Sequence, residues 1–583
     1  MIDLESLNRE QRRAVEAGDG PLLIVAGPGT GKTKTLTMRI VYLIEHDHVP
    51  ADHILALTFT KKAAEEMSSR VEHLLGSAKR ARPHITTFHA LCHELLGGEL
   101  QFITEPQRLQ VIKQLSRPTT LKQMSPRELG LRISRVKNKA EEDEDLTKMV
   151  VAYDAALEEL GMLDFDDLLT RVDALLSSDE TVRNKLHERF RYILVDEFQD
   201  TNKLQYDLLQ QLRGNDNLFV IGDPLQSIYG FRGASGDIFE RFKADFPKAH
   251  EIVLTRNYRS APEVVALSNA LFAEAPQLQA HKTTPGTVHA VQVLNEYSEA
   301  SWVLDEIQRA IGGGDMLRAV SDDDARMHRT LKDFAILYRS RIAAGAMQKA
   351  LEESGLPYQV VGDGSPYEEA KVQAIIALMK SAQTGEAPHL EGFSAGQSAA
   401  IKDLLGQTEG VLPHTLAEKI IALLGFENTL ALTQFVGSLV RFTTLAEAVA
   451  HFEKIAETTF YDPDVDAITL LTIHASKGLE FPSVFLIGAE EGILPYVGPW
   501  QKKDTNKYPD DEERRLFYVA TTRAKDQLAI LHTTKRAGQP AHLSHFAQEL
   551  SPEVLPQEVD AHFETDQRRA VKRAIKRSQQ TLF

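Results

Sequence analysis

Cysteine is nearly absent from this chain, since Cys92 is the only one among 583 residues. A lone thiol excludes an internal disulfide and any zinc or iron–sulfur site that needs several cysteine ligands. Long apolar runs are also missing, and the polar N-terminus MIDLESLNREQRR has no signal-peptide core. We therefore expect Cys92 to be a small buried residue and the protein to be cytoplasmic, with no membrane partner.

Positive charge is in deficit too, because Lys and Arg number 66 against 83 Asp and Glu, which gives a formal net charge of −17. This balance excludes a protein that coats nucleic acid through an overall positive field. It still allows a motor that is acidic outside and basic only in a channel. Length and composition indicate a globular protein of about four structural units.

Short apolar runs recur along the chain, with helical stretches between them and polar, Gly-rich or aromatic residues directly after them. This pattern predicts open parallel sheets whose ligands gather beyond the carboxyl ends of the strands. One set of predicted strands comprises Leu22 to Ala26, Ile54 to Phe59, Tyr192 to Val195, Leu218 to Ile221 and Ile252 to Leu254. A second set comprises Val291 to Leu294, Phe334 to Tyr338, Tyr358 to Val361, Ile468 to Thr472, Val484 to Ile487 and Leu528 to Leu531. The predicted fold class is α/β, with two parallel-sheet domains.

A helix-rich insertion is expected in each domain. The first domain is predicted at residues 1–87 and 164–260, with its insertion at 88–163. The second domain is predicted at residues 261–380 and 467–535, with its insertion at 381–466. Residues 536–583 are predicted to form a C-terminal tail with a basic segment.

The segment AGPGTGKT follows a predicted strand and precedes a helix-compatible stretch, as a phosphate-binding loop does. Glycines let the backbone approach an anion closely, Lys32 would neutralise the β and γ phosphates, and the Thr33 hydroxyl would hold Mg²⁺. The alternative is a Gly-rich surface turn. The predicted nucleotide contacts of this loop are Ala26, Gly27, Pro28, Gly29, Thr30, Gly31, Lys32 and Thr33.

The segment VDEFQD supplies two carboxylates at the end of another predicted strand. Phosphate chemistry needs a carboxylate for the metal and a group that orients the attacking water. We expect Asp196 to bind Mg²⁺ through water and Glu197 to polarise the hydrolytic water. Read alone, the same residues could form an ordinary acidic turn.

These two segments are followed, in order, by GDPLQSIYGFRGA, NYRS, HASKGLEF and YVATTRAK. From about Leu7 to Leu531 the chain resembles the UvrD/Rep/PcrA-like DNA helicases of superfamily 1. The resemblance implies two RecA-like motor domains that close on ATP. It departs from the family at Pro224 and Leu225, where close relatives often carry acidic residues, and in the second insertion, which is short. Ala26 replaces a glycine of the strict phosphate-loop pattern, a change that this family tolerates.

Several ATP-site residues are implied by the resemblance. Gln11 is expected to pair with the adenine edge, Gln226 to sense the γ-phosphate and Tyr258 to stack on adenine. Arg259 and Arg523 are expected to reach the γ-phosphate. Both guanidinium groups are expected to come from the second domain. With Lys32, Asp196 and Glu197 they complete the predicted catalytic set, and Glu480 is a further predicted nucleotide-site residue.

DNA contacts are implied by other motifs. Hydroxyls and N–H groups suit phosphates, and aromatic rings suit bases of any sequence. The predicted DNA-binding residues are Thr58, Phe59, Thr60, Thr87, His89, Tyr229, Phe231, Arg232, Thr472 and His474. The alternatives are core packing for the aromatic residues and a satisfied buried histidine for His474. Glu480 is expected to pair with Arg232.

The chain ends with the basic stretch RRAVKRAIKR and then QQTLF. This ending resembles short peptides that dock replication sliding clamps, with Gln579 in a polar pocket and Leu582 and Phe583 in an apolar one. The alternative is a solvated tail.

The resemblance implies an ATP- and Mg²⁺-dependent helicase that moves 3′ to 5′ on single-stranded DNA and unwinds tailed duplex DNA, in repair or replication. Two alternatives stay open. One is a single-stranded-DNA translocase that displaces proteins or needs a partner to unwind. The other is a nucleotide-gated DNA-binding scaffold without useful turnover.

Overall fold

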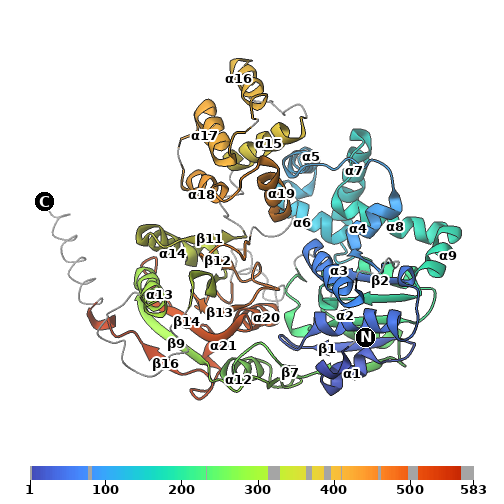
Figure 1. Cartoon of the computed structure of the whole chain (residues 1–583), viewed down its shortest axis with the longest axis horizontal. Helices are drawn as coiled ribbons and strands as arrows, with labels where there is room; N and C mark the ends of the chain where they lie inside the picture. The colour runs from blue at the N-terminus through green and yellow to red at the C-terminus, as the bar shows by residue number, and fades with distance from the viewer. Residues whose placement is uncertain are drawn as a thin grey trace. The chain divides into compact units, whose positions relative to one another are not determined.

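The structure is a computed structural model that describes residues 3–76, 82–230, 233–234, 236–312, 329–362, 370–385, 395–408, 410–427, 429–456, 461–496 and 510–565. The chain divides into two compact units. Unit 1 comprises Met1–Gly286 and Lys503–Thr522, and unit 2 comprises Thr287–Lys502 and Arg523–Phe583. Figure 1 labels many of their helices and strands.

Unit 1 is built on a six-stranded sheet in the order β3-β2-β4-β5-β1-β6, and all its strand pairs are parallel. Its strands are β1 (Leu22–Ala26), β2 (Ile54–Thr58), β3 (His84–Thr87), β4 (Tyr192–Val195), β5 (Leu218–Gly222) and β6 (His250–Leu254). Parallel strands end at the same edge, so the loops after β1, β4 and β5 are neighbours there.

Helices cover both faces of this sheet because successive strand residues point to opposite sides. Leu22 and Ile24 of β1 pack with α1 (Arg9–Val15), α2 (Lys32–Glu45) and α3 (Lys61–Leu75), whereas Leu23 faces the other layer. That layer comprises α4 (Phe88–Leu96), α8 (Phe165–Ser178), α9 (Glu180–Arg189), α10 (Lys203–Leu212) and α11 (Ile238–Asp245). Cys92 is buried there, as expected, and burial raises the pKa of its thiol to about 12.

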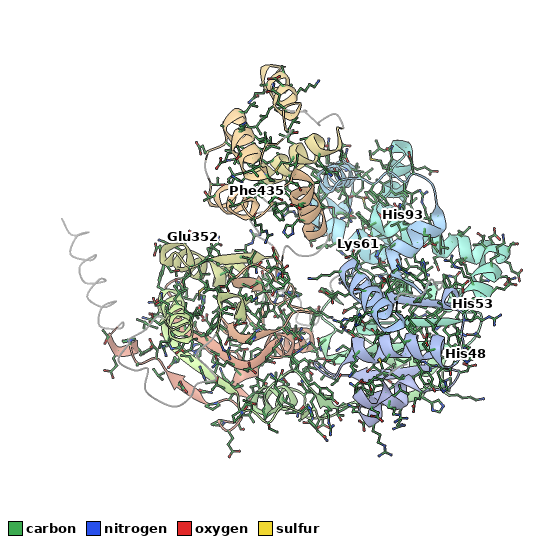
Figure 2. The ribbon with its side chains drawn as sticks, in the orientation of Figure 1. His48, His53, Lys61, His93, Glu352 and Phe435 are labelled. Carbon is green, nitrogen blue, oxygen red and sulfur yellow. The ribbon has the colours of Figure 1, made fainter. Side chains whose placement is uncertain are left out.

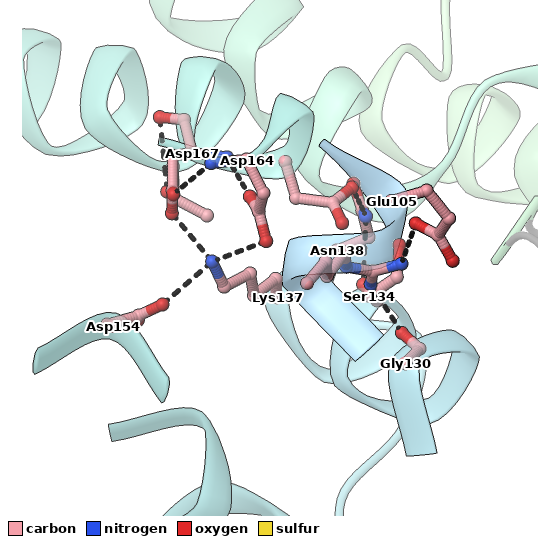
Figure 3. Close-up of polar contacts among 11 residues, drawn as sticks. Glu105, Gly130, Ser134, Lys137, Asn138, Asp154, Asp164 and Asp167 are labelled. Atoms are coloured by element: carbon pink, nitrogen blue, oxygen red, sulfur yellow. Dashed lines mark hydrogen bonds and ion pairs between the residues drawn. The ribbon is translucent and has the colours of Figure 1, made fainter. Parts of the chain in front are cut away.

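A separate helical insertion in unit 1 comprises α5 (Glu105–Ser116), α6 (Pro126–Lys137) and α7 (Glu144–Leu160), which share a small apolar core. Lys137 ties it to α8, as Figure 3 shows. The buried Lys137 Nζ lies 2.7 Å from Asp154, 3.0 Å from Asp164 and 2.7 Å from Asp167. Although burial alone lowers the pKa of this ammonium, Asp164 and Asp167 outweigh it and the pKa rises above its usual value.

Unit 2 contains a second sheet in the order β11-β12-β10-β13-β14-β9-β16, with parallel pairs along this path. Its strands are β9 (Thr287–Asn295), β10 (Phe334–Tyr338), β11 (Tyr358–Val361), β12 (Ile468–Thr472), β13 (Phe481–Leu486), β14 (Ala524–Arg536) and β16 (Gln557–Val559); β15 (Gln539–Pro540) pairs antiparallel with β14. Helices α13 (Glu296–Ala310) and α14 (Arg341–Ser354) pack on one face through alternate residues such as Phe334 and Ile336.

The insertion of unit 2 is all-helical and has its own core. It comprises α15 (Ala370–Thr384), α16 (Ala395–Leu405), α17 (Pro413–Leu424), α18 (Leu430–Leu439) and α19 (Leu445–Ala456). Phe435, labelled in Figure 2, is fully buried among these helices. Among the described residues, none of the helices is both long and apolar enough to cross a bilayer.

All the predicted strands are confirmed, to within a few residues at their ends. The sequence missed β3 and β16, which lie at sheet edges, and the two-residue strands β7 (Arg256–Asn257), β8 (Gln279–Ala280) and β15. The two units also differ from the predicted domain borders, because α12 (Pro262–Leu271) and α20 (Asp510–Thr521) both belong to unit 1. In addition α4, predicted as part of the first insertion, packs into the core of the sheet through Phe88 and Leu91.

Candidate active site and nucleic-acid interface

The phosphate loop runs from the end of β1 to the start of α2. Gly29 and Gly31 have positive φ angles of 67° and 84°, a region that costs glycine little and other residues more. The left-handed Gly31 is the N-cap of α2, so the loop delivers the unpaired N–H groups of a helix N-terminus. Such groups bind phosphate oxygens well.

Lys32 begins α2 and folds back over this loop. Its ammonium donates to the carbonyl oxygens of Ala26 at 3.2 Å and Gly27 at 3.4 Å. The Thr30 hydroxyl donates to Gly27 at 2.8 Å, and Thr33 lies in the first turn of α2. Lys32 is thus held at the loop, where it can meet the negative charge of a phosphate.

A second segment, residues 257–260, is bonded directly to the loop. The Asn257 amide nitrogen donates to the Pro28 carbonyl at 2.8 Å, and the Tyr258 backbone N–H donates to the Gly29 carbonyl at 2.8 Å. The Asn257 side-chain oxygen accepts from the backbone N–H groups of Arg259 and Ser260. Asn257 therefore fixes the backbone of Arg259 against the phosphate loop.

This arrangement corrects one expectation about the two arginines. Arg259 belongs to unit 1, as the phosphate loop does, and not to the second domain. The physical reason is the pair of bonds from Asn257 and Tyr258 to the loop. Arg523 lies in unit 2, where its fully buried guanidinium donates to the Leu479 carbonyl at 3.1 Å.

The two predicted catalytic carboxylates follow β4. Asp196 is buried, and burial raises the pKa of its carboxyl to about 7, with Glu197 adding to the rise and Lys32 opposing it. Glu197 has a φ of 48°, which is uncommon for a residue other than glycine. Its side chain is half-buried and accepts a hydrogen bond from the Gln199 amide. The charge of Lys32 thus acts on the buried Asp196 carboxyl.

Gln226 lies in the 3-10 turn η5 (Pro224–Gln226), directly after β5 and Asp223. It is buried and donates to Asp223 at 2.6 Å, and burial raises the pKa of that carboxyl. The Gln199 side-chain oxygen accepts from the Asp223 backbone N–H at 2.8 Å. Gln199 therefore joins the Glu197 segment to the Gln226 segment in one hydrogen-bond network.

Gln11 lies beside the same loop but already has protein partners. Its amide nitrogen donates to the Thr30 carbonyl at 2.8 Å, and its amide oxygen accepts from the Asn8 backbone N–H. The Asn8 side chain in turn donates to the Tyr258 hydroxyl at 3.0 Å. One N–H and one lone pair of the Gln11 amide are not used by these bonds, so its predicted role toward adenine stays a prediction.

The predicted DNA contacts of unit 1 lie at the other end of the same sheet edge. Thr58 and Thr87 are paired neighbours at the ends of β2 and β3. The Thr60 and Thr87 hydroxyls accept from the first turns of α3 and α4. Lys61, labelled in Figure 2, begins α3. The place combines hydroxyls, two helix N-termini and a cation, all of which suit a phosphate backbone.

An aromatic pair completes this region. The rings of Phe59 and Tyr229 stack with their centroids 5.3 Å apart and their planes 14° from parallel. Phe59 is 36% exposed, so its ring is accessible for stacking on a base. His89 is half-buried on α4, and burial lowers its pKa. Phe231 and Arg232 lie outside the described residues.

The remaining predicted residues belong to unit 2. Thr472 ends β12, and its hydroxyl accepts from the Ala475 N–H at 3.2 Å; His474 follows it and is half-buried. Glu480 is exposed and pairs with Lys525 at 2.8 Å. The tail residues Gln579, Leu582 and Phe583 lie outside the described residues.

Comparison with known proteins agrees with this geometry. Residues 7–247 match the UvrD/REP helicase N-terminal domain, and residues 252–384 and 429–535 match the UvrD-like helicase C-terminal domain. The ATP-dependent DNA helicase UvrD1 of Mycobacterium tuberculosis is 30% identical, over 95% of this chain and 86% of that protein. The chain belongs to the UvrD-like helicase family. The ATP-dependent DNA helicase PcrA of Staphylococcus aureus is 29% identical, over 95% of this chain and 87% of that protein.

Two residues of this UvrD-like helicase that organise the site were not singled out from the sequence. Asn257 joins its segment to the phosphate loop, and Gln199 joins the segments after β4 and β5. Asn257 lies in the motif NYRS and Gln199 in the motif VDEFQD. Membership of these motifs was the only sequence signal that could have pointed to them. Their roles depend on partners far away in the chain, so no local pattern could have shown them.

Proposed function

We propose that this chain is an ATP-dependent DNA helicase that translocates 3′ to 5′ on single-stranded DNA and unwinds tailed duplex DNA, in repair or replication. One observation carries the proposal. A single edge of the unit 1 sheet holds a phosphate loop with two carboxylates at one end, and hydroxyls with a stacked aromatic pair at the other. A motor that converts nucleotide hydrolysis into strand movement needs both.

In this reading the loop N–H groups and Lys32 bind the phosphates, and Gln226 contacts the γ-phosphate. Asp196 and Thr33 would hold Mg²⁺, which neutralises phosphate charge when bound. The carboxylate of Asp196 and the hydroxyl of Thr33 are oxygen donors of the kind that Mg²⁺ prefers. Glu197 orients and polarises the attacking water, and Arg259 and Arg523 stabilise charge in the transition state.

On the DNA side, Thr58, Thr60 and Thr87 hold phosphates and the Phe59–Tyr229 pair stacks on bases. None of these contacts depends on the identity of the base. A motor that translocates along DNA requires such sequence-independent contacts. Thr472 and His474 of unit 2 are proposed to contact the same strand. We also propose that the protein works in the cytoplasm.

The decisive experiment compares the unwinding of 3′-tailed and 5′-tailed duplexes by the full chain, with ATP hydrolysis measured in parallel. We expect hydrolysis stimulated by single-stranded DNA and unwinding of the 3′-tailed duplex alone. A Lys32→Ala variant serves as the inactive control. Unwinding from the 5′ tail alone would overturn the polarity, and hydrolysis that is indifferent to DNA would overturn the motor.

A second candidate is a translocase that displaces proteins or unwinds only with a partner. Residues 385–428, which include α16 and α17, lie outside the family match, so the accessory insertion differs from that of the family. Strong DNA-stimulated hydrolysis without unwinding of either duplex would favour this reading. If the protein binds nucleotide and DNA tightly but does not hydrolyse ATP, the result would indicate a nucleotide-gated DNA-binding scaffold.

The C-terminal QQTLF suggests a partner as well. We propose that Gln579, Leu582 and Phe583 dock a replication sliding clamp. A pull-down with purified clamp tests this directly, because deletion of residues 579–583 should abolish capture while leaving DNA-stimulated hydrolysis unchanged. Equal capture by the full and shortened chains would end the idea.

A further inference from the structure

Helix α20 (Asp510–Thr521) packs within unit 1, although Arg523 and the chain after it belong to unit 2. Its second half is buried, including Phe517 and Tyr518. The Tyr518 ring meets Phe272, the residue after α12, edge-on, with centroids 5.5 Å apart. Thr522 follows the end of the helix, and Arg523 comes directly after Thr522. Any shift of α20 therefore moves the backbone from which Arg523 extends.

The first half of α20 is bonded to the Gln226 segment. Arg515 Nε donates to the carbonyl oxygen of Ser227 at 2.8 Å. Ser227 directly follows Gln226, and its hydroxyl donates to the Gln199 carbonyl at 3.2 Å. Burial lowers the pKa of the half-buried Arg515, against the effect of Glu512 and Asp511, but a guanidinium remains protonated in any case.

The far end of α20 is bonded to the Arg259 segment. Thr522, the residue after the helix, accepts a hydrogen bond from the Arg259 guanidinium through its carbonyl oxygen at 3.4 Å. The helix is thus connected at one end to the segment that carries Gln226 and at the other to Arg259. Arg515 supplies the shorter of these two connections.

We propose that Arg515 is a positioning residue for ATP hydrolysis: it fixes the Gln226 segment to α20, so that contact of Gln226 with the γ-phosphate sets the placement of Arg523. This inference rests on the proposed function. Arg515 itself touches neither nucleotide nor DNA. It acts through the Ser227 carbonyl and the helix, because a misplacement of about 1 Å in a catalytic group can cost about 100-fold in rate.

The test uses the full chain and four variants: Arg515→Ala, Arg515→Lys, Arg523→Ala and Arg183→Ala. Arg183 is the matched control, since it is also a half-buried arginine of unit 1 that donates to a backbone carbonyl, that of Leu176 at 2.6 Å, on helices away from the phosphate loop. Steady-state hydrolysis with saturating single-stranded DNA gives kcat and KM for ATP, fluorescent nucleotide titration gives affinity, and thermal unfolding gives Tm.

For Arg515→Ala we expect kcat to fall about 10- to 100-fold while the nucleotide dissociation constant changes by less than about 3-fold. Arg515→Lys should recover part of the rate, because its ammonium can reach a carbonyl but lacks the fixed direction of Nε–H. Arg183→Ala should keep the wild-type kcat even if its Tm falls. A normal kcat for Arg515→Ala, or an equal loss for Arg183→Ala, would overturn the proposal.

A double variant separates positioning from a general structural effect. If Arg515 acts through Arg523, Arg515→Ala combined with Arg523→Ala should be no slower than Arg523→Ala alone. Multiplied losses would contradict the inference. Failure of the proposed function would look different, because the wild-type chain itself would then show no DNA-stimulated hydrolysis.

Discussion

The side-chain amide of Asn257 donates to the carbonyl oxygen of Pro28 at 2.8 Å, across 229 positions of the chain. This bond brings residues 257–260 against the phosphate loop, where Tyr258 also bonds to Gly29. Arg259 is thereby placed beside Gly29. The Arg259 segment and the phosphate loop are bonded to each other, so a change in the conformation of one should alter the conformation of the other.

Gly29→Ala tests this close approach. A Cβ atom at Gly29 would lie 2.7 Å from Arg259 Cβ and 2.9 Å from Asn257 Nδ2, and the φ of 67° is itself unfavourable for alanine. We expect nucleotide affinity to fall by about 10-fold or more, since left-handed backbone alone costs about 1–2 kcal/mol. Fluorescent nucleotide titration measures it. Gly18→Ala is the control, because nothing lies within 4 Å of its Cβ position; equal affinities for both variants would refute the prediction.

Glu197→Gln tests the assignment of the water-polarising group. Glutamine keeps the size of the side chain and an oxygen that can accept from Gln199, but it cannot act as a base. Nucleotide affinity should stay within about 3-fold of wild type, whereas DNA-stimulated turnover should fall by about 100- to 1000-fold. The exposed Glu188 of α9 offers a matched control as Glu188→Gln, which should turn over normally. Wild-type turnover in Glu197→Gln would remove Glu197 from the catalytic set.

Strand positions were predictable because central parallel strands are buried on both faces and read as short apolar runs. Tyr192–Val195 and Phe334–Tyr338 were predicted with the observed bounds. The missed β3 has no such run, since its four residues are only half-buried at the sheet edge. The unit to which α20 belongs could not be predicted either, because it depends on contacts with segments distant in sequence.

The residues of the candidate site also divide into those that local sequence can predict and those whose roles depend on distant partners. Phosphate-loop and carboxylate residues could be predicted because their expected chemistry depends on local backbone shape, and Gly31 and Glu197 both have positive φ angles. The placement of Arg259 with the loop and the linking role of Gln199 depend on long-range hydrogen bonds. A local sequence pattern contains no information about such partners.

Lys137→Met tests the ion cluster between the first insertion and α8 (Figure 3). Removal of the buried ammonium leaves Asp164 and Asp167 close together without a cation, and burial with Asp164 already raises the pKa of Asp167 to about 6. We expect a loss of about 3–5 kcal/mol in the free energy of unfolding, measured in urea. Lys148→Met removes an exposed lysine paired with Glu144 and should cost at most about 1 kcal/mol. Similar losses in both variants would show that the cluster contributes little.

A buried cluster in unit 2 should make stability depend on pH. Arg536 lies 2.8 Å from both Glu299 and Glu490, and Glu299 also accepts from the Gly488 N–H at 2.9 Å. Burial raises the pKa of the Glu299 carboxyl from 4.5 to about 7, Glu490 adds to the rise and Arg536 opposes it. The folded protein therefore keeps a proton on Glu299 over a range in which the unfolded chain has lost it.

The sign follows from that proton. Where the folded state binds more protons than the unfolded state, the free energy of unfolding falls as pH rises, so the contribution of Glu299 is complete below about pH 4.5 and is lost as pH rises through about 7. Glutamine at this position cannot titrate. The stability of Glu299→Gln minus that of wild type should therefore rise between pH 5 and pH 8, by up to roughly 3 kcal/mol. Urea unfolding across this range measures it, and Asp305→Asn, at an exposed position of the same helix, should show a constant difference. A flat or falling difference for Glu299→Gln would mean that Glu299 is already ionised in the folded protein at pH 5.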